Sequence, residues 1–333
     1  MTKISVIGAG SFGTAMAVTA ARSGNDVALW AHDPEVAAAI RETGENADYL
    51  GGLKLGDHVH PTNDLAEAAT YSETIFMVVP SHHYREVLSN LKTHLRGPVK
   101  VISGTKGIEN ESLDRMSEVT RDVLGDQLAS FAVLSGPTFA IETARGDPSA
   151  AVIASKDIDF AQEVQHFMSS PAFRLYYSDD VVGVELAGSL KNVIAIAAGV
   201  LEGLGLGSNT NAALITRGLR EITRLGMALG GKIETFAGLA GMGDLVLTCT
   251  GALSRNRAVG TLLGKGQTLE EILSNSKFVA EGVKTAKSAQ ALSERHRIEM
   301  PITSEMYRVL YEGESARQGL QRLMTRSLKA EVS

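Results

Sequence analysis

One lysine lies where the sequence is otherwise almost entirely apolar. Lys191, followed by Asn192, interrupts the apolar segment 185–198, and Ala187 and Ala195 share its face if the segment is helical. An ammonium on a dry face is costly unless it is paired, and it loses its proton more easily than in water. Lys191 is therefore a candidate general acid or base near neutral pH. The alternative is a lysine that extends along the surface to solvent.

A second lysine, Lys106, directly follows an expected strand in the segment 103–107. Ligands of α/β proteins bind at the carboxyl ends of the strands, so we expect Lys106 to face that crevice rather than bulk solvent. Gly136 and Thr138 follow another expected strand. They offer backbone N–H and hydroxyl groups to an anion or a hydroxyl, unless they only form a turn before a helix at Ala140.

An acid and a cluster of donors complete the set. Asp244 is the natural counter-charge to Lys191, and Ser254, Arg255 and Asn256 bring a hydroxyl, a guanidinium and an amide together. Arginine binds phosphate oxygens bidentately, and a helix start nearby adds N–H donors. The formal net charge is −6, so an anionic substrate would need such a local cluster. The alternative is a helix cap with solvated arginines.

A glycine turn near the N-terminus predicts a dinucleotide site. Gly8, Gly10, Ser11, Phe12 and Gly13 belong to the run Gly-Ala-Gly-Ser-Phe-Gly between an apolar segment and an alanine-rich one. In a strand–turn–helix unit the first glycine allows the turn, the second lets a pyrophosphate approach, and the third lets helix and strand pack closely. The helix start attracts phosphate through its free N–H groups. A purely structural turn is the alternative.

The end of the second expected strand bears on cofactor choice. An NAD site normally has an acid there for the ribose 2′-hydroxyl, but this strand ends Trp30-Ala31-His32-Asp33. The missing acid at Ala31 removes repulsion against a 2′-phosphate, and His32 can donate a hydrogen bond to it. Asp33 is also suited to cap the next helix. These residues favour NADP, with NAD tolerated.

The elements that position these groups change character near residue 180. Before it, expected strands alternate with helices, which predicts a doubly wound, mostly parallel sheet. The strands are 3–7, 26–30, 74–79, 99–103, 131–134, 150–154 and 173–177, and the helices include 34–43, 84–95 and 112–124. After it, only helical periodicity is found, over 184–202, 214–229, 268–274, 283–296 and 304–312. We predict an α/β Rossmann domain over 1–180 and an all-α substrate domain over 181–333.

Composition excludes several classes of protein. Of 333 residues, 44% are hydrophobic and 21% charged, which is typical of a globular protein with two domains. The acidic balance argues against nucleic acid as a partner. The longest apolar stretch, 193–201, is too short to span a bilayer, and no signal peptide is evident. The single cysteine, Cys249, fits a reducing cytoplasm and is expected to be buried rather than nucleophilic.

No metal site is expected. His58 and His60, like His82 and His83, have a spacing that suits a metal, but no carboxylate or thiolate accompanies them at ligand spacing. We expect them to be solvated loop residues.

Taken together, these segments resemble the NAD(P)-dependent glycerol-3-phosphate dehydrogenases of bacteria over about residues 3–325. The motifs that carry the resemblance are Gly8-Ala9-Gly10-Ser11-Phe12-Gly13, Val78-Val79-Pro80-Ser81, Thr105-Lys106-Gly107, Ser135-Gly136-Pro137-Thr138-Phe139-Ala140, Leu190-Lys191-Asn192-Val193, Gly241-Met242-Gly243-Asp244-Leu245 and Ser254-Arg255-Asn256-Arg257.

The resemblance implies interconversion of dihydroxyacetone phosphate and sn-glycerol 3-phosphate for phospholipid synthesis in the cytoplasm, by a homodimer. Lys191 would donate and accept the proton. The residues implied to hold substrate are Lys106, Gly136, Thr138, Asn192, Asp244, Ser254, Arg255 and Asn256. Those implied to line the cofactor site are Ser11, Phe12, His32, Lys106, Ala140, Arg255, Val279 and Glu281.

Two other functions share parts of this pattern. A β-hydroxyacid or ketopantoate-type dehydrogenase has the same kind of fold and a helix lysine, but its substrates carry a carboxylate in place of a phosphate. A non-catalytic protein that senses NADPH would bind the cofactor and have no need of Lys191 or Arg255.

Overall fold

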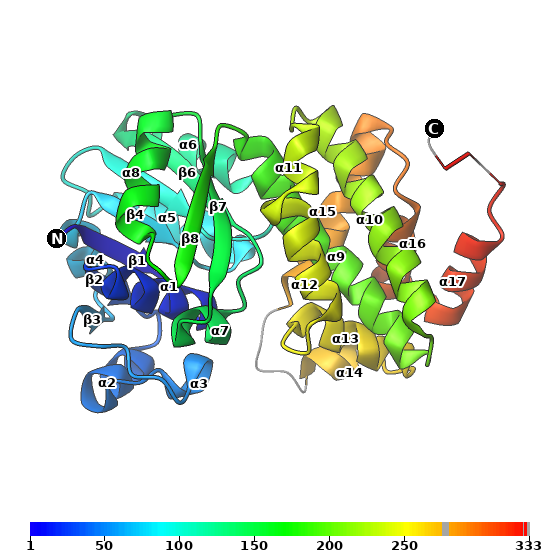
Figure 1. The fold of residues 1–333 in the computed structure, drawn as a ribbon, viewed down its shortest axis with the longest axis horizontal. Coiled ribbons are helices and arrows are strands. Elements are labelled where there is room, and N and C mark those ends of the chain that lie inside the picture. The colour runs from blue at the N-terminus through cyan, green and yellow to red at the C-terminus, as the bar shows by residue number, and fades with distance from the viewer. Residues whose placement is uncertain (275–279, 329, 332–333) are drawn as a thin grey trace.

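A computed structural model describes residues 1–274, 280–328 and 330–331 of the chain. A sheet covered by helices lies beside a body made of helices (Figure 1). The strands are β1 (Lys3–Ile7), β2 (Asp26–Trp30), β3 (Val59–Thr62), β4 (Thr74–Met77), β5 (Val99–Ser103), β6 (Leu128–Ser135), β7 (Ser149–Ser155) and β8 (Phe173–Ser178). Their order is β3-β2-β1-β4-β5-β6-β7-β8, and neighbours pair in parallel except β6 with β7. The predicted mostly parallel, doubly wound sheet is confirmed.

Helices cover both faces of this sheet. They are α1 (Ser11–Arg22), α2 (Pro34–Thr43), α3 (Ala47–Leu50), α4 (Leu65–Tyr71), α5 (Ser81–Lys92), α6 (Met116–Leu124), α7 (Ala140–Arg145) and α8 (Ile158–Met168), with a 3-10 turn at Gly125–Gln127. Side chains of a strand alternate between faces, so Val6 packs with α1 and α8 while its neighbour Ile7 packs with α4, α5 and α6. The burial of both faces explains the nearly continuous apolar strands.

The second half of the chain is built around one long helix, α9 (Val181–Gly203). Around it lie α10 (Ser208–Ala228), α11 (Ile233–Ala237), a π-helical turn (Leu239–Gly243), α12 (Asp244–Thr250), α13 (Arg255–Gly264), α14 (Leu269–Ser274), α15 (Glu281–His296), α16 (Pro301–Tyr311) and α17 (Ala316–Met324). Although α9 is long and apolar enough to cross a membrane, 94% of its apolar window is buried inside the protein. It is therefore the core helix of this body.

The two halves meet between β8 and α9. Asp180 caps α9 by accepting a hydrogen bond from the N–H of Gly183 at 2.9 Å, and it accepts another from the N–H of Lys232 at 2.8 Å. This buried carboxylate therefore fixes the start of α9 relative to the segment that leads to α12. The boundary between residues 180 and 181 stays a prediction.

The structure contains elements that were not predicted, and the ends of several predicted elements differ. Helices without a predicted counterpart include α3, α4, α8, α11 and α17. Strand β3 was not predicted, because Val-His-Pro-Thr has little apolar character and contains a proline. Helix α10 begins at Ser208 instead of 214, since its first turn is polar and carries no periodicity. Helix α5 begins at Ser81 instead of 84, whereas α6 begins at Met116 instead of 112. None of these differences moves a predicted site residue to another element.

Candidate active site

The glycine turn between β1 and α1 is tightly packed at two positions and open at a third. Gly8 has φ of +116°, and a Cβ there would lie 2.5 Å from the carbonyl oxygen of Val78. A Cβ on Gly13 would lie 1.8 Å from the carbonyl oxygen of Gly8. A Cβ on Gly10 would meet no heavy atom within 4 Å, and no side chain caps α1 there. The open position and the uncapped helix start fit the pyrophosphate of a dinucleotide.

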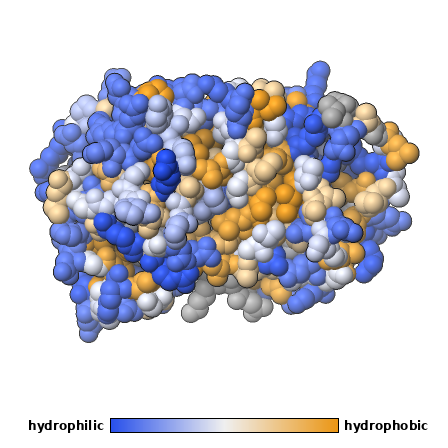
Figure 2. All heavy atoms as spheres, viewed as in Figure 1, coloured by the Kyte–Doolittle hydropathy of each residue, from blue (hydrophilic) through white to orange (hydrophobic). Residues whose placement is uncertain are grey.

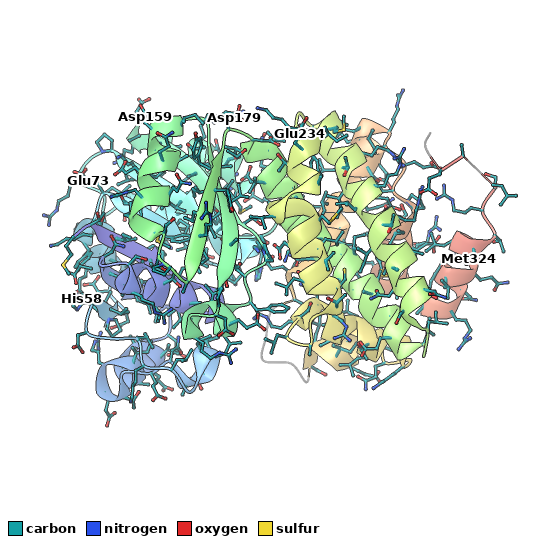
Figure 3. The ribbon with its side chains drawn as sticks, in the orientation of Figure 1. His58, Glu73, Asp159, Asp179, Glu234 and Met324 are labelled. Carbon is teal, nitrogen blue, oxygen red and sulfur yellow. The ribbon has the colours of Figure 1, made fainter. Side chains whose placement is uncertain are left out.

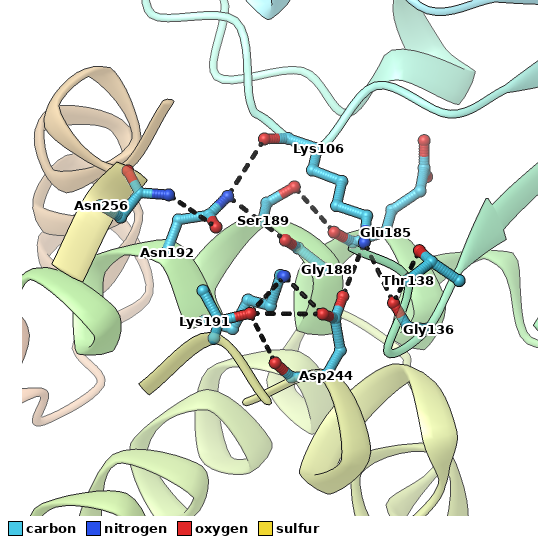
Figure 4. Close-up of polar contacts among 11 residues, drawn as sticks. Lys106, Gly136, Thr138, Glu185, Gly188, Ser189, Lys191, Asn192, Asp244 and Asn256 are labelled. Carbon is cyan, nitrogen blue, oxygen red and sulfur yellow. Dashed lines mark hydrogen bonds and ion pairs between the residues drawn. The ribbon is translucent and has the colours of Figure 1, made fainter. Parts of the chain in front are cut away.

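Lys106 reaches from the sheet into the helical half of the chain (Figure 4). Its Nζ donates to Asp244 Oδ2 at 2.7 Å and to the carbonyl oxygen of Gly136 at 3.3 Å. It also lies 5.6 Å from the ring centroid of Phe12, in the glycine turn. The alternative of a solvated loop lysine is therefore wrong. This ammonium joins the glycine turn to the acid on α12.

Gly136 and Thr138 are brought to Lys106 by the end of β6. Gly136 has φ of +154°, and a Cβ there would lie 2.8 Å from Cα of Ala151 in β7. Its carbonyl oxygen also accepts a hydrogen bond from the hydroxyl of Thr138 at 3.1 Å. The tight turn thus places a carbonyl and a hydroxyl beside the ammonium of Lys106.

Lys191 is buried in the middle of α9. Its Nζ donates to Asp244 Oδ1 at 2.5 Å and to the hydroxyl of Thr248 at 2.7 Å (Figure 4). Burial lowers the pKa of Lys191 to about 8, although the negative charge of Asp244 opposes this shift. The direction of this shift agrees with the expected easier deprotonation. The alternative of a surface lysine is wrong because only 6% of the residue is exposed.

Asp244, the first residue of α12, forms ion pairs with both lysines. Burial alone would raise its pKa, but the adjacent ammonium groups of Lys106 and Lys191 outweigh burial and hold that pKa below its ordinary value. Thr248, one helical turn on, donates to the carbonyl oxygen of Asp244 at 2.6 Å. Sequence reasoning missed Thr248, although the four-residue spacing from Asp244 could have found it.

Two asparagines link three helices beside the lysines. The amide nitrogen of Asn256 on α13 donates to Oδ1 of Asn192 on α9 at 3.0 Å, and the N–H of Gly282 on α15 donates to Asn256 Oδ1 at 2.9 Å. The Nδ2 of Asn192 lies 3.5 Å from the carbonyl oxygen of Lys106. Asn256, expected to hold substrate, already has its amide oxygen and nitrogen engaged, and it orients Asn192.

The predicted cation cluster divides into groups with different surroundings. The hydroxyl of Ser254 accepts a hydrogen bond from the N–H of Arg257 at 3.2 Å and so caps α13. Arg257 pairs with Glu202 at 3.0 Å. Arg255 is exposed, and among the described residues no carboxylate lies within 4 Å of its guanidinium. Arg255 therefore keeps its donors for a ligand.

Glu281 joins the two halves at a second point. Its carboxylate accepts hydrogen bonds from the N–H of Ser81 at 3.0 Å and from the Ser81 hydroxyl at 2.6 Å. Glu281 begins α15 and Ser81 begins α5, which follows the carboxyl end of β4 after three residues. This contact brings the start of α15 to the edge of the sheet where the glycine turn lies. Val279 lies outside the described residues.

Comparison with known proteins assigns the chain to a family. Residues 3–161 match the N-terminal model, and residues 180–321 the C-terminal model, of NAD-dependent glycerol-3-phosphate dehydrogenase. The chain is 52% identical over 330 residues to glycerol-3-phosphate dehydrogenase (NAD(P)+) of Geobacter sulfurreducens. This match covers 99% of this chain and 98% of the relative. It belongs to the NAD-dependent glycerol-3-phosphate dehydrogenase family. As a member, it is an oxidoreductase that uses NAD or NADP.

Solved structures agree with this assignment. The glycerol-3-phosphate dehydrogenase of Coxiella burnetii has a TM-score of 0.94 at 39% identity, over 98% of this chain and 99% of that chain. A ketopantoate reductase from Ralstonia eutropha has a TM-score of 0.60 at 17% identity, over 97% of this chain and 100% of that chain. The second likeness shows the fold alone.

In this dehydrogenase the end of β2 presents an exposed histidine. His32 is exposed, with its ring centroid 5.8 Å from that of Trp30. Asp33 accepts a hydrogen bond from the N–H of Glu35 at 2.9 Å, which confirms that it caps α2. Ala140 is the first residue of α7, directly after the Gly136–Thr138 turn. Both His32 and Ala140 thus follow strand ends at the same edge of the sheet as the glycine turn.

Groups outside this cluster have other partners. Cys249 is buried, as expected, and burial raises the pKa of its thiol to about 12. His58 and His60 lie 3.5 and 2.8 Å from Asp26, a carboxylate that is distant in the sequence. All four histidines are exposed, as expected, but the expectation that they lie in loops is wrong for His60, which belongs to β3, and for His82 and His83, which belong to α5. His58 lies on the side of the sheet domain away from the helical body (Figure 3). Within the described ranges, no set of three or more His, Cys, Asp or Glu residues could hold a metal ion.

Proposed function

We infer that this dehydrogenase interconverts dihydroxyacetone phosphate and sn-glycerol 3-phosphate. The observation that carries the inference is the meeting of Lys106 and Lys191, from the two halves of the chain, on the single carboxylate of Asp244. The three groups together carry one net positive charge next to the glycine turn. Such a site attracts an anionic ketone and can neutralise the charge that grows on its carbonyl oxygen.

The residues around the glycine turn fit a nicotinamide dinucleotide. The open space at Gly10 leaves room for the pyrophosphate, and Gly8 and Gly13 allow the tight turn beside it. The side chains that would line the remaining cofactor are Ser11, Phe12, His32, Lys106, Ala140, Arg255 and Glu281. When bound, the nicotinamide supplies a hydride to the ketone carbon or accepts one from the alcohol. We propose that NADP is preferred, because Ala31 offers no carboxylate to repel a 2′-phosphate and Asp33 is engaged as a helix cap.

Lys191 is the proposed proton donor during reduction. Its pKa of about 8 keeps the ammonium mostly protonated at neutral pH and still lets it release a proton. The proton passes from Nζ to the carbonyl oxygen as negative charge develops there. Lys106 and the amide of Asn192 stabilise that charge, and Asp244 with Thr248 holds Nζ in place. In the opposite direction the neutral amine of Lys191 takes the hydroxyl proton.

Arg255 is the proposed anchor for the substrate phosphate. Its exposed guanidinium offers two parallel donors, and it starts α13, whose first N–H groups also favour an anion. The hydroxyl of Ser254 and the polar groups of Gly136 and Thr138 lie on the elements that flank the two lysines. Binding energy from the remote phosphate orients the reacting carbon against the proton donor.

A spectrophotometric assay tests the proposed function. Purified protein is mixed with NADH or NADPH and with dihydroxyacetone phosphate, a 2-keto acid or a 3-keto acid, and the loss of absorbance at the nicotinamide band is followed. We expect turnover with dihydroxyacetone phosphate and faster turnover with NADPH. Turnover with a keto acid alone would favour a ketopantoate-type enzyme, and cofactor binding without turnover would favour a sensor.

We also propose that the enzyme is a homodimer of the cytoplasm that supplies glycerol 3-phosphate to phospholipid synthesis. Met242, Val246 and Leu253 are 41–52% exposed. Apolar side chains also gather on the face of the helical body that Figure 2 shows. An apolar face of this kind supports association of two copies. The single buried cysteine suits a reducing compartment. Sedimentation equilibrium of the wild type and of Val246→Glu tests the dimer, since only the wild type should have twice the chain mass.

A further inference from the structure

Asn46 stands at the N-cap of α3 but does not cap that helix. Asparagine at this position ordinarily accepts a hydrogen bond from an N–H in the first turn, whereas the Asn46 side chain makes no such bond. Its Nδ2 instead donates to the carbonyl oxygen of Ala9 at 2.8 Å and to the hydroxyl of Thr14 at 2.8 Å. Only 2% of Asn46 is exposed. Both N–H groups of the Asn46 amide thus donate hydrogen bonds, one to the glycine turn and one to the first turn of α1.

The contact with Ala9 fixes the orientation of one peptide in that turn. The hydroxyl of Thr14 approaches the same carbonyl oxygen at 3.3 Å, so Ala9 is held from two sides. In a trans peptide the C=O and the following N–H point in opposite directions, and the described chain has no cis bond. Holding the carbonyl of Ala9 toward Asn46 therefore turns the N–H of Gly10 the other way. Gly10 is also the position where an added Cβ would meet open space.

We propose that Asn46 is a positioning residue for the cofactor, which holds the Ala9–Gly10 peptide so that its N–H faces the pyrophosphate. The inference rests on the proposed use of a dinucleotide at this turn. Asn46 touches the backbone that binds the phosphates and does not act in hydride or proton transfer. It should therefore affect cofactor affinity and leave the chemical step unchanged.

Two substitutions remove this contact in different ways. Asn46→Ala takes away both donors and leaves the Ala9 carbonyl to Thr14 alone. Asn46→Asp keeps the shape but sets a carboxylate oxygen against the carbonyl oxygen of Ala9, which repels it. Loss of a buried hydrogen bond that orients a ligand donor should raise the Kd for NADPH about tenfold, and more for the aspartate. We expect kcat at saturating NADPH, and KM for dihydroxyacetone phosphate, to stay within about twofold of the wild type.

Asn25 provides a matched control at the C-terminal end of α1, the helix whose N-terminal end Asn46 contacts. Asn25 is also buried, and its Nδ2 donates to two carbonyl oxygens, of Ala20 at 2.8 Å and of Phe167 at 2.7 Å. Asn25→Ala removes the same number of buried hydrogen bonds from the C-terminal end of α1 and touches no part of the glycine turn. It should lower Tm about as much as Asn46→Ala while leaving the Kd for NADPH unchanged.

Titration calorimetry with NADPH, together with thermal unfolding, tests the inference on the wild type and the three variants. A raised Kd for both Asn46 variants with an unchanged Kd for Asn25→Ala is the expected result. Wild-type affinity in the Asn46 variants, or an equal loss in Asn25→Ala, would overturn the positioning role. Should the Asn46 variants fail to fold, Thr14→Val removes the second partner of the same amide and should raise Kd in the same direction. Wild-type protein that binds neither NADPH nor NADH would instead refute the proposed function.

Discussion

Nζ of Lys191 lies 2.5 Å from Oδ1 of Asp244, and both groups are almost completely buried. The other oxygen of the same carboxylate holds Lys106, so each ammonium is paired although only one acid is present. Pairing offsets the cost of burying Lys191. Two ammonium groups and one carboxylate leave one net positive charge, which can attract an anion. This arrangement makes the protonation of Lys191 sensitive to each partner.

The depressed pKa of Lys191 predicts opposite pH profiles for the two directions of the reaction. Reduction needs the ammonium, so its kcat should be constant below about pH 8 and fall about tenfold per pH unit above it. Oxidation of glycerol 3-phosphate needs the neutral amine, so its kcat should rise with pH up to about 8. Asp244→Asn removes the charge that favours the ammonium, and both limbs should move to lower pH. If kcat of Asp244→Asn changed at the same pH as in the wild type, the role of Lys191 as proton donor and acceptor would be contradicted.

Replacing Lys191 by alanine should separate catalysis from binding. The variant lacks the proton donor, and we expect kcat to fall by about 100- to 10,000-fold, the usual contribution of a positioned general acid. Asp244 keeps Lys106 as its partner, so the chain should still fold and bind NADPH. Steady-state kinetics and calorimetry measure the two effects. Turnover near the wild-type rate would remove Lys191 from its role.

Replacing Arg255 by alanine should weaken the grip on substrate phosphate. Loss of a charge-assisted pair typically costs about 1.5–3 kcal/mol, so KM for dihydroxyacetone phosphate should rise about 10- to 100-fold. Arg257→Ala is the control, because that arginine is one half-turn away and is paired with Glu202. A KM that rises equally in both variants, or in neither, would show that another cation holds the phosphate.

Local sequence patterns predict most of the sheet and the central helix because their causes are local. Strand β4 and helix α9 are continuous apolar segments, and Gly8 and Gly13 mark a turn that only glycine allows. The buried lysine was also predictable, since Lys191 interrupts an apolar helix. Its need for a counter-charge led to Asp244, which the structure places beside it.

Contacts between distant segments could not be predicted in this way. Asp26 lies 34 residues from His60, and nothing in the spacing shows that β2 and β3 pair. The Asn192–Asn256 bond spans 64 residues and depends on how α13 packs on α9. Asn46 breaks the local rule for a helix cap because a partner 37 residues away offers a better use of its amide. In each case tertiary packing selects the partner.

Two glycines of the same turn should respond differently to the same added methyl group. A Cβ on Gly13 would lie 1.8 Å from the Gly8 carbonyl oxygen, which cannot move without opening the turn, so Gly13→Ala should lose at least about 3 kcal/mol of stability. A Cβ on Gly10 meets nothing within 4 Å, so Gly10→Ala should unfold at nearly the wild-type temperature. That methyl group would occupy the space proposed for the pyrophosphate, and the Kd for NADPH should rise at least about tenfold. Thermal unfolding and calorimetry on both variants measure these effects. If Gly10→Ala bound NADPH as tightly as the wild type, the open space at Gly10 could not be where the phosphates lie.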